Sequence, residues 1–235
     1  KPGLICYMVL SYAYARAENG YVLWLRYAKI NNPVLLGQYR RQISSPAVTG
    51  QSQTITIIKD ELTRAFAGFT GNNYTILSSP SKNSALVISK AAVNAFITTE
   101  ELLKVGSEGY IIKSKPGSTI ITGNTDTGVL YGVFHFLRLM QMHKDISNLN
   151  IASAPKLKLR LLNHWDNLNR TVERGYAGFS IWHWHTLPDY IDQRYIDYAR
   201  ANASIGINGT VLTNVNANAT VLTKPYLEKV KALAD

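Results

Sequence analysis

Cysteine and acidic side chains are scarce in this sequence. Its 235 residues include one cysteine, Cys6, and 15 Asp and Glu residues against 25 Lys and Arg residues. A single cysteine excludes an internal disulfide and a metal site built from a cluster of cysteines. Charged residues make up only 17% of the chain and apolar residues 46%. This composition argues against a disordered or coiled-coil protein and allows a sizeable core, with room for two domains.

The shortage of acidic residues leaves a formal net charge of +10. A charge of this size can attract nucleic acid or another anionic partner. However, no run of Lys and Arg exceeds two residues, and the basic residues are scattered through both halves of the chain. Two explanations stay open: a basic binding face, or a fragment that lacks the acidic portion of a longer protein.

The sequence also has no apolar run long enough to cross a membrane, but it begins with a short one. Lys1 precedes a mostly apolar stretch from Leu4 to Tyr14, which ends in Ala13-Tyr14-Ala15. A basic start, a short apolar run and a small-residue cleavage site are typical of a secretory signal. The alternative is a hydrophobic first strand, but the run is too short to span a bilayer. We predict a signal peptide at residues 1–15 and a periplasmic or secreted protein.

Residues 16–152 have the pattern of a small α/β domain. The expected elements are a strand at 21–27, mainly loop or a short helix at 28–50, a strand or helix start at 54–59, a helix at 60–69, short strands at 74–77 and 86–89, a hairpin of 109–114 and 118–122, and a helix at 127–142. Thr125 or Asp126 can cap the last helix, and Gly128 and Gly132 would let it pack closely. Residues 153–155 form the linker out of this domain.

A different pattern follows the linker. Strands are expected at 158–163 and 209–213, each followed by a helix, at 192–205 and 226–234. The first apolar run reads as a buried strand, and both strands lead into polar rims. Such a βαβα unit is a quarter of an eightfold barrel and cannot close by itself. The sequence therefore predicts a small two-layer α/β amino-terminal domain (16–152) followed by the first quarter of a (β/α)8 TIM barrel (153–235), truncated.

Several long motifs resemble glycoside hydrolase family 67, the α-glucuronidases that act on xylan-derived oligosaccharides. These motifs are LNHWDNL at 162–168, TVERGYAG at 171–178, SIW at 180–182, ASIGING at 203–209, NVNA at 214–217, ENGYVLWLRY at 18–27 and DTGVLYG at 126–132. They occur in the family's order and run from about residue 18 to the end. One departure is Asn169-Arg170, where many members carry Asp-Gly, which changes a turn.

The resemblance implies a xylan-degrading enzyme that hydrolyses, with inversion, the α-1,2 bond between 4-O-methylglucuronic acid and xylose. An inverting enzyme needs an acid and a base roughly 6.5–9.5 Å apart. In the family these carboxylates lie on later barrel strands, so we expect no catalytic residue in this chain and no activity from it alone. Asp166 and Glu173 are interpreted as hydrogen-bonding or structural groups of the rim. The family uses no cofactor and no metal.

The resemblance also implies substrate-binding residues. Trp165 matches the tryptophan that lines the glucuronic acid pocket, and Val215 matches the apolar residue that receives the 4-O-methyl group. Burying one methyl contributes about 0.8 kcal/mol. Core filling for Trp165 and plain strand packing for Val215 are the alternatives. Asn214 and Asn216 are candidate partners of sugar hydroxyls, or turn-forming asparagines, and Asp166 completes the predicted set.

Three further hypotheses compete with this one. His183, His185 and His164 are conceivable zinc ligands, although the tryptophans beside them favour packing. The chain is alternatively a non-catalytic uronic-acid-binding module, or part of a β-hexosaminidase-like barrel hydrolase. The partners expected from the family are glucuronoxylan-derived oligosaccharides, with no nucleic acid and no membrane after signal cleavage. A homodimer of the full-length protein stays open.

Overall fold

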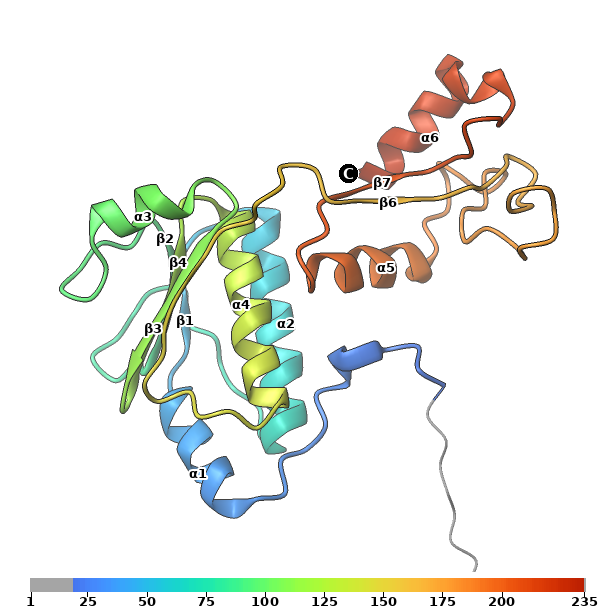
Figure 1. The fold of residues 1–235 in the computed structure, drawn as a ribbon. Coiled ribbons are helices and arrows are strands. Elements are labelled where there is room, and N and C mark those ends of the chain that lie inside the picture. The colour runs from blue at the N-terminus through green and yellow to red at the C-terminus, as the bar shows by residue number, and fades with distance from the viewer. Residues whose placement is uncertain (1–18, 235) are drawn as a thin grey trace, which may run out of the picture.

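The computed structural model describes residues 19–234, so the predicted signal peptide lies outside the described residues. Within them the chain forms a five-stranded sheet flanked by helices and a smaller two-stranded unit (Figure 1). The strands of the large sheet are β1 (Ala47–Val48), β2 (Leu86–Lys90), β3 (Tyr110–Lys115), β4 (Ser118–Gly123) and β5 (Asn150–Ser153). The helices around it are η1 (Leu23–Arg26), α1 (Pro33–Gln42), α2 (Gln53–Thr70), α3 (Thr99–Val105) and α4 (Asp126–Gln141).

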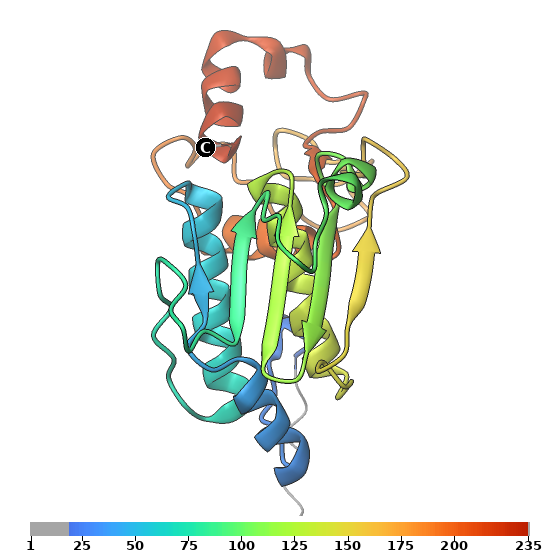
Figure 2. The ribbon, with the colours of Figure 1, turned by 90° about the vertical axis from the view of Figure 1, so that its left-hand side faces the viewer.

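The strand order of the large sheet is β1-β2-β4-β3-β5, which Figure 2 shows face-on. Strands β1, β2 and β4 are parallel, whereas β3 runs antiparallel to both β4 and β5. The predicted hairpin is confirmed, because β3 and β4 pair from Tyr110 with Gly123 to Lys115 with Ser118. Gly117 takes a left-handed conformation (φ 74°) in the turn between them, where a residue without Cβ is favoured.

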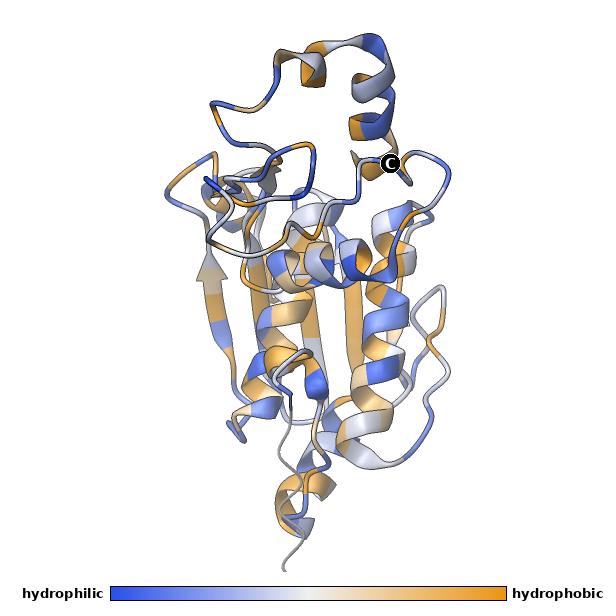
Figure 3. Ribbon diagram, turned by 90° about the vertical axis from the view of Figure 1, so that its right-hand side faces the viewer, coloured by the Kyte–Doolittle hydropathy of each residue, from blue (hydrophilic) through white to orange (hydrophobic). Residues whose placement is uncertain are grey.

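Helices α2 and α4 cover one face of this sheet (Figures 1 and 3). Both helices were predicted, and α2 absorbs the ambiguous 54–59 segment into one long helix. Thr125 caps α4 by accepting a hydrogen bond from the Gly128 amide at 3.2 Å, as predicted. A Cβ on Gly132 would lie 2.9 Å from the Ile121 side chain, so this glycine does allow α4 to approach the sheet closely.

Two predicted strands are wrong. Residues 23–26 form the short helix η1, and Leu25 within it and Tyr27 just after it are buried in the main core rather than paired in the sheet. Tyr21, Val22 and Leu23 are 46–59% exposed, so the β-branched and aromatic residues of this segment did not make it a strand, because β-propensity depends on packing against neighbouring strands. Residues 74–77 contribute one isolated bridge, Ala47 to Leu77. The sequence also missed α3, which a Thr98–Glu101 capping box begins, and the edge strand β5.

The second unit consists of β6 (Leu161–Asn163), α5 (Gln193–Ala203), β7 (Gly209–Val211), η2 (Ala219–Leu222) and α6 (Lys224–Ala234). β6 and β7 are parallel, with Leu161 opposite Gly209 and Asn163 opposite Val211, so the predicted βαβα order is confirmed. Both strands are shorter than predicted. The prediction that the first strand is buried is wrong for the described chain, since Leu161 and Leu162 of β6 are 44% and 39% exposed. Two strands alone cannot cover each other's faces.

Two charged contacts fasten this unit to the sheet unit. The Arg200 guanidinium on α5 donates to both carboxylate oxygens of Glu61 on α2, each at 2.7 Å, and the Tyr27 hydroxyl donates to the same carboxylate. Arg160, just before β6, pairs with Glu108 at 2.8 Å. The α5 helix therefore lies against the outer side of the α2–α4 layer (Figure 1), and the two units share an interface that the sequence did not predict.

No helix among residues 19–234 combines the length and the apolar character needed to span a membrane.

Candidate functional site

The polar segments that follow β6 and β7 lie side by side. The strands are parallel and in register, so their carboxyl ends meet at one edge. The pairing continues beyond them: the His164 amide donates to the Val211 carbonyl at 3.0 Å, and the Asn214 amide donates to the Asp166 carbonyl at 2.8 Å. The structure thus brings together the segment carrying Trp165 and Asp166 and the segment carrying Asn214. We call residues 164–168 together with 212–216 the rim.

Trp165 is half-exposed on this rim, with 49% of its surface open to solvent. The chain folds back behind it, because its carbonyl accepts a hydrogen bond from the Glu173 amide at 2.7 Å and Asp166 bridges to Val172. Its backbone is therefore held while the indole stays open. A tryptophan that filled the core of this chain would be buried, as Trp182 and Trp184 are. The open indole leaves an aromatic face on which the apolar side of a sugar ring can pack.

Asp166 differs from Trp165 in being buried, at 3% exposure. Its Oδ2 has no hydrogen-bond partner among the described residues, and the nearest basic group is His164 Nδ1 at 3.5 Å. His164 Nε2 lies 2.7 Å from the Tyr198 hydroxyl, which lies 3.3 Å from Thr210 Oγ1. Asp166 is thus the last member of a series of neighbouring polar side chains that extends from the rim to α5. In the described chain it supports the rim from beneath rather than opening to solvent.

Asn214, Val215 and Asn216 form a turn. Asn214 is buried, and its side-chain oxygen accepts a hydrogen bond from the Asn216 amide at 2.8 Å. This is the local bond by which asparagine favours turns. The turn directs Val215 outward, so that 90% of its surface is exposed. Plain strand packing does not describe Val215, since β7 ends at Val211.

The aromatic block after the rim packs into a small core of its own. Trp182, Trp184, Leu187 and Tyr195 form a buried cluster, and Trp184 lies against Tyr226 of α6. The rings of His183 and His185 are 5.9 Å apart, while His164 contacts Trp182 and Tyr198 instead. In the part of the chain that the structure describes, no three His, Cys, Asp or Glu side chains are arranged to hold a metal ion.

The Asn169-Arg170 departure falls at a turn with an unusual backbone. Arg170 has a φ of 72°, a left-handed conformation that glycine adopts at no steric cost. The turn is held nonetheless, because the Ser180 amide donates to the Arg170 carbonyl at 2.8 Å and the Asn169 side chain accepts from Thr171. The glycine that the resemblance implies at this position would suit the same turn, and Arg170 keeps the turn at some conformational cost.

Sequence reasoning missed the contribution of Tyr198 to this site. Tyr198 falls within the helix predicted at 192–205, which was given no part in the site, yet it joins His164 and Thr210 behind the rim. The signal was available in the spacing of Tyr195 and Tyr198, which places both hydroxyls on the α5 face that packs against β6 and the aromatic block. What the spacing could not show was which strand residue each hydroxyl would meet.

Two consecutive parts of the chain match two parts of one family. Residues 23–136 match the "Glycosyl hydrolase family 67 N-terminus", and residues 139–235 match the "Glycosyl hydrolase family 67 middle domain". A parallel βαβα unit with an open aromatic rim behind an α/β domain is consistent with a carbohydrate-active protein. Since the two matches together cover nearly the whole described chain, the chain belongs to glycoside hydrolase family 67.

Curated relatives agree with this assignment. The chain is similar to alpha-glucuronidase A of Emericella nidulans, with 31% identity over 94% of this chain and 27% of that protein. It is also similar to the alpha-glucuronidase of Hypocrea jecorina, with 32% identity over 93% of this chain and 27% of that protein. The chain therefore spans about a quarter of the length of these relatives.

Among solved structures, a GH20 β-N-acetylhexosaminidase from Streptomyces coelicolor is similar over 71% of this chain and 29% of its own, at 16% identity and a TM-score of 0.48. At that score the likeness carries no argument for a hexosaminidase activity.

Proposed function

We propose that this chain is the amino-terminal part of a xylan-degrading α-glucuronidase that releases glucuronic or 4-O-methylglucuronic acid from xylo-oligosaccharides by inverting hydrolysis of the α-1,2 bond. The observation that carries the proposal is the similarity of both units to one family, whose curated relatives are named alpha-glucuronidases. In this proposal Trp165 is a wall of the glucuronic acid pocket and the exposed Asn216 is a partner of sugar hydroxyls, while the buried Asp166 and Asn214 hold the rim in place.

The exposed apolar surface of the second unit supports a continuing barrel. Leu157, Leu159, Leu161 and Val211 are 41–73% exposed along β6, β7 and the segment before them. An open sheet edge with apolar residues is a site of further pairing. We propose that residues 16–152 are the amino-terminal domain, that residues 153–235 begin a (β/α)8 barrel, and that later strands of a longer protein cover this surface.

The catalytic carboxylates belong, in this proposal, to those later strands. Asp166 is buried beneath the rim, and Glu173 also has a buried Oε2 without a hydrogen-bond partner in the described chain. Neither has the open placement that an acid facing a leaving group, or a base facing a water molecule, requires. The residues of this chain therefore bind and orient the sugar, and other segments transfer the protons.

The proposal is tested by comparing this chain with the longer protein on 4-O-methylglucuronic acid-substituted xylo-oligosaccharides. We expect the longer protein to release the uronic acid, initially as the β-anomer, and the 235-residue chain to release none. Chromatography measures the release and NMR the anomer. No release by the longer protein would refute the function, whereas turnover by the short chain would refute our placement of the catalytic groups.

Val215 is expected to tune the preference for the methylated sugar. In the longer protein, Val215→Ala should narrow the ratio of kcat/KM for methylated over unmethylated substrate by no more than a few-fold, because one methyl contact contributes about 0.8 kcal/mol. Rates on the two matched oligosaccharides measure it. Leu222→Ala is a suitable control, since Leu222 is also exposed but lies outside the rim. An unchanged ratio in Val215→Ala would remove this residue from the methyl-binding position.

The proposed protein is periplasmic or secreted. When the protein is expressed from its native start in a bacterium, we expect cleavage near Ala15 and export of the remainder, because residues 1–15 have the order of a secretory signal. Intact mass of the exported protein measures the cleavage site. A mature protein that retains residues 4–15 would count against the prediction.

A further inference from the structure

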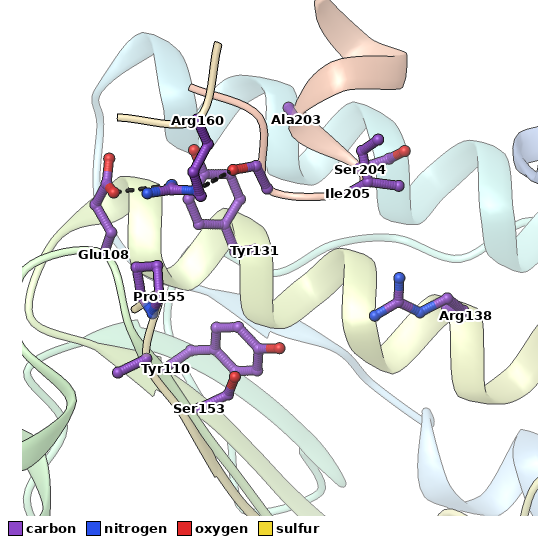
Figure 4. A pocket seen from close by; sticks show the side chains of 12 residues that line it. Glu108, Tyr110, Tyr131, Arg138, Ser153, Pro155, Arg160, Ala203, Ser204 and Ile205 are labelled. Carbon is purple, nitrogen blue, oxygen red and sulfur yellow. Dashed lines mark hydrogen bonds and ion pairs between the residues drawn. The ribbon is translucent and has the colours of Figure 1, made fainter. Parts of the chain in front are cut away.

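A cavity of about 230 Å³ lies where the two units meet (Figure 4). Tyr110 and Ser153 from the sheet and Tyr131 and Arg138 from α4 line one side, and Arg160 with the turn after α5 lines the other. The cavity is separate from the rim. Arg160 and the α5 turn precede β6 and β7, whereas the rim follows them, so the two places lie at opposite ends of the strands.

Most charged and polar groups around this cavity are already paired. Glu108 binds Arg160 at 2.8 Å, and the same guanidinium donates to the carbonyls of Gly206 at 2.5 Å and Leu157 at 2.7 Å and stacks over Tyr131. The carbonyl of Ala203, at the end of α5, accepts the Gly206 amide at 3.0 Å. The negative groups of the wall are therefore neutralised, and Arg160 acts as part of the wall.

Arg138 is different, because its guanidinium makes no hydrogen bond or ion pair with any residue in the described range 19–234. It extends from the last turn of α4, and Figure 4 shows the guanidinium and the Tyr110 hydroxyl pointing toward the same space. That hydroxyl lies 2.9 Å from His135 Nδ1. Burial and the nearby Arg138 charge lower the pKa of His135, so His135 is neutral at pH 7. Arg138 is thus the uncompensated positive charge of the cavity.

We propose that this cavity binds a small hydroxylated carboxylate of the size of one uronic acid. A guanidinium fork matches a carboxylate with two parallel hydrogen bonds. The Tyr110 ring offers an apolar face for a sugar ring, and the half-buried Ser153 hydroxyl offers a donor and acceptor for sugar hydroxyls. Drug-sized ligands use cavities of roughly 300–1,000 Å³, so a smaller cavity suits a single ring. The proposal goes beyond the proposed function, since it involves neither the rim nor catalysis.

Binding at this place would join the two units. Its walls come from the sheet, α4, the segment before β6 and the turn after α5, so a bound anion contacts both sides of their interface. A ligand that binds only the docked form stabilises it in proportion to its occupancy. We therefore expect the ligand to raise the temperature at which the chain unfolds.

The test is a calorimetric titration of the 235-residue chain with D-glucuronate, with D-glucose, acetate and inorganic phosphate as separate probes. We expect saturable binding of glucuronate, at least about tenfold weaker binding of acetate and phosphate, and no binding of glucose. Binding of phosphate as tight as that of glucuronate would overturn the ligand class. Absence of saturable glucuronate binding would overturn the site.

Variants locate the binding. Arg138→Gln should weaken glucuronate binding at least about tenfold, and Arg138→Lys should restore part of it, since Lys keeps the charge but not the fork. Arg194→Gln is the matched control, because Arg194 is an exposed arginine roughly 14 Å away from Ala203 along α5. It should bind as the parent does. Since the Arg138 guanidinium has no partner among the residues that the structure describes, its variants should keep the parent's melting temperature without ligand.

Trp165→Ala separates this site from the rim. With the rim contact removed by Trp165→Ala, the glucuronate binding that remains in the 235-residue chain should still be lost when Arg138→Gln is added. Binding that Trp165→Ala abolishes and Arg138→Gln leaves intact would place the ligand at the rim and overturn the inference. That result would leave the proposed function standing, so the two failures are distinguishable.

Discussion

Trp165→Ala in the longer protein is expected to lower kcat/KM at least about tenfold while leaving thermal stability nearly unchanged. The indole is half-exposed and makes no side-chain hydrogen bond with any residue from 19 to 234, while the backbone around it is held by the Glu173 amide. Removing it takes away a face that the sugar contacts before and during cleavage but little of the core. Steady-state kinetics beside thermal unfolding measure the two effects.

A second tryptophan of the same segment gives the matched control. Trp184 is fully buried in the cluster with Trp182 and Tyr195, so Trp184→Ala should cost about 3–5 kcal/mol of unfolding free energy. Trp165→Ala should therefore lower activity with little loss of stability, whereas Trp184→Ala should lower the stability of the folded protein. A Trp165→Ala protein that unfolds early yet turns over normally while folded would make Trp165 a packing residue and remove it from the proposed pocket.

Glu61→Ala is expected to cause the largest loss of stability among the charged positions. Glu61 is 2% exposed and accepts from Arg200 and Tyr27 at the interface between α2, α5 and η1. Its removal leaves a mostly buried guanidinium and a buried hydroxyl without their partner. Breaking such a pair costs about 3 kcal/mol or more, which corresponds to a melting temperature lower by roughly 6–12 °C. Denaturant and thermal unfolding of the 235-residue chain measure the loss.

The control for this variant is Glu100→Ala. Glu100 pairs with Lys104 at 2.6 Å on α3, but both side chains are more than 70% exposed, and exposed pairs contribute little. We expect no measurable change in the melting temperature. Equal effects of Glu61→Ala and Glu100→Ala would mean that the Arg200–Glu61 contact does not hold the two units together.

Local patterns in the sequence determined the α/β order of the chain. The 3.6-residue apolar spacing of α4, its Thr125 cap and the Pro116-Gly117 turn between β3 and β4 are set by residues close together in the chain. The order β6, α5, β7, α6 was predictable for the same reason. So was the meeting of Trp165, Asp166 and Asn214, because parallel strands bring their carboxyl ends to one edge.

Only the tertiary structure decided which side chains are open and which are buried. Trp165 and Trp184 are alike in the sequence, yet one is half-exposed and the other fully buried. The Arg200–Glu61 contact joins residues 139 positions apart, and Arg160 reaches Glu108 across the same interface. Such pairs depend on the docking of α5 against α2 and α4, and the spacing of residues within one helix or strand does not predict how helices dock. Within residues 19–234 Arg138 is likewise unpaired because Glu108, the acidic residue of the cavity lining, binds Arg160 instead.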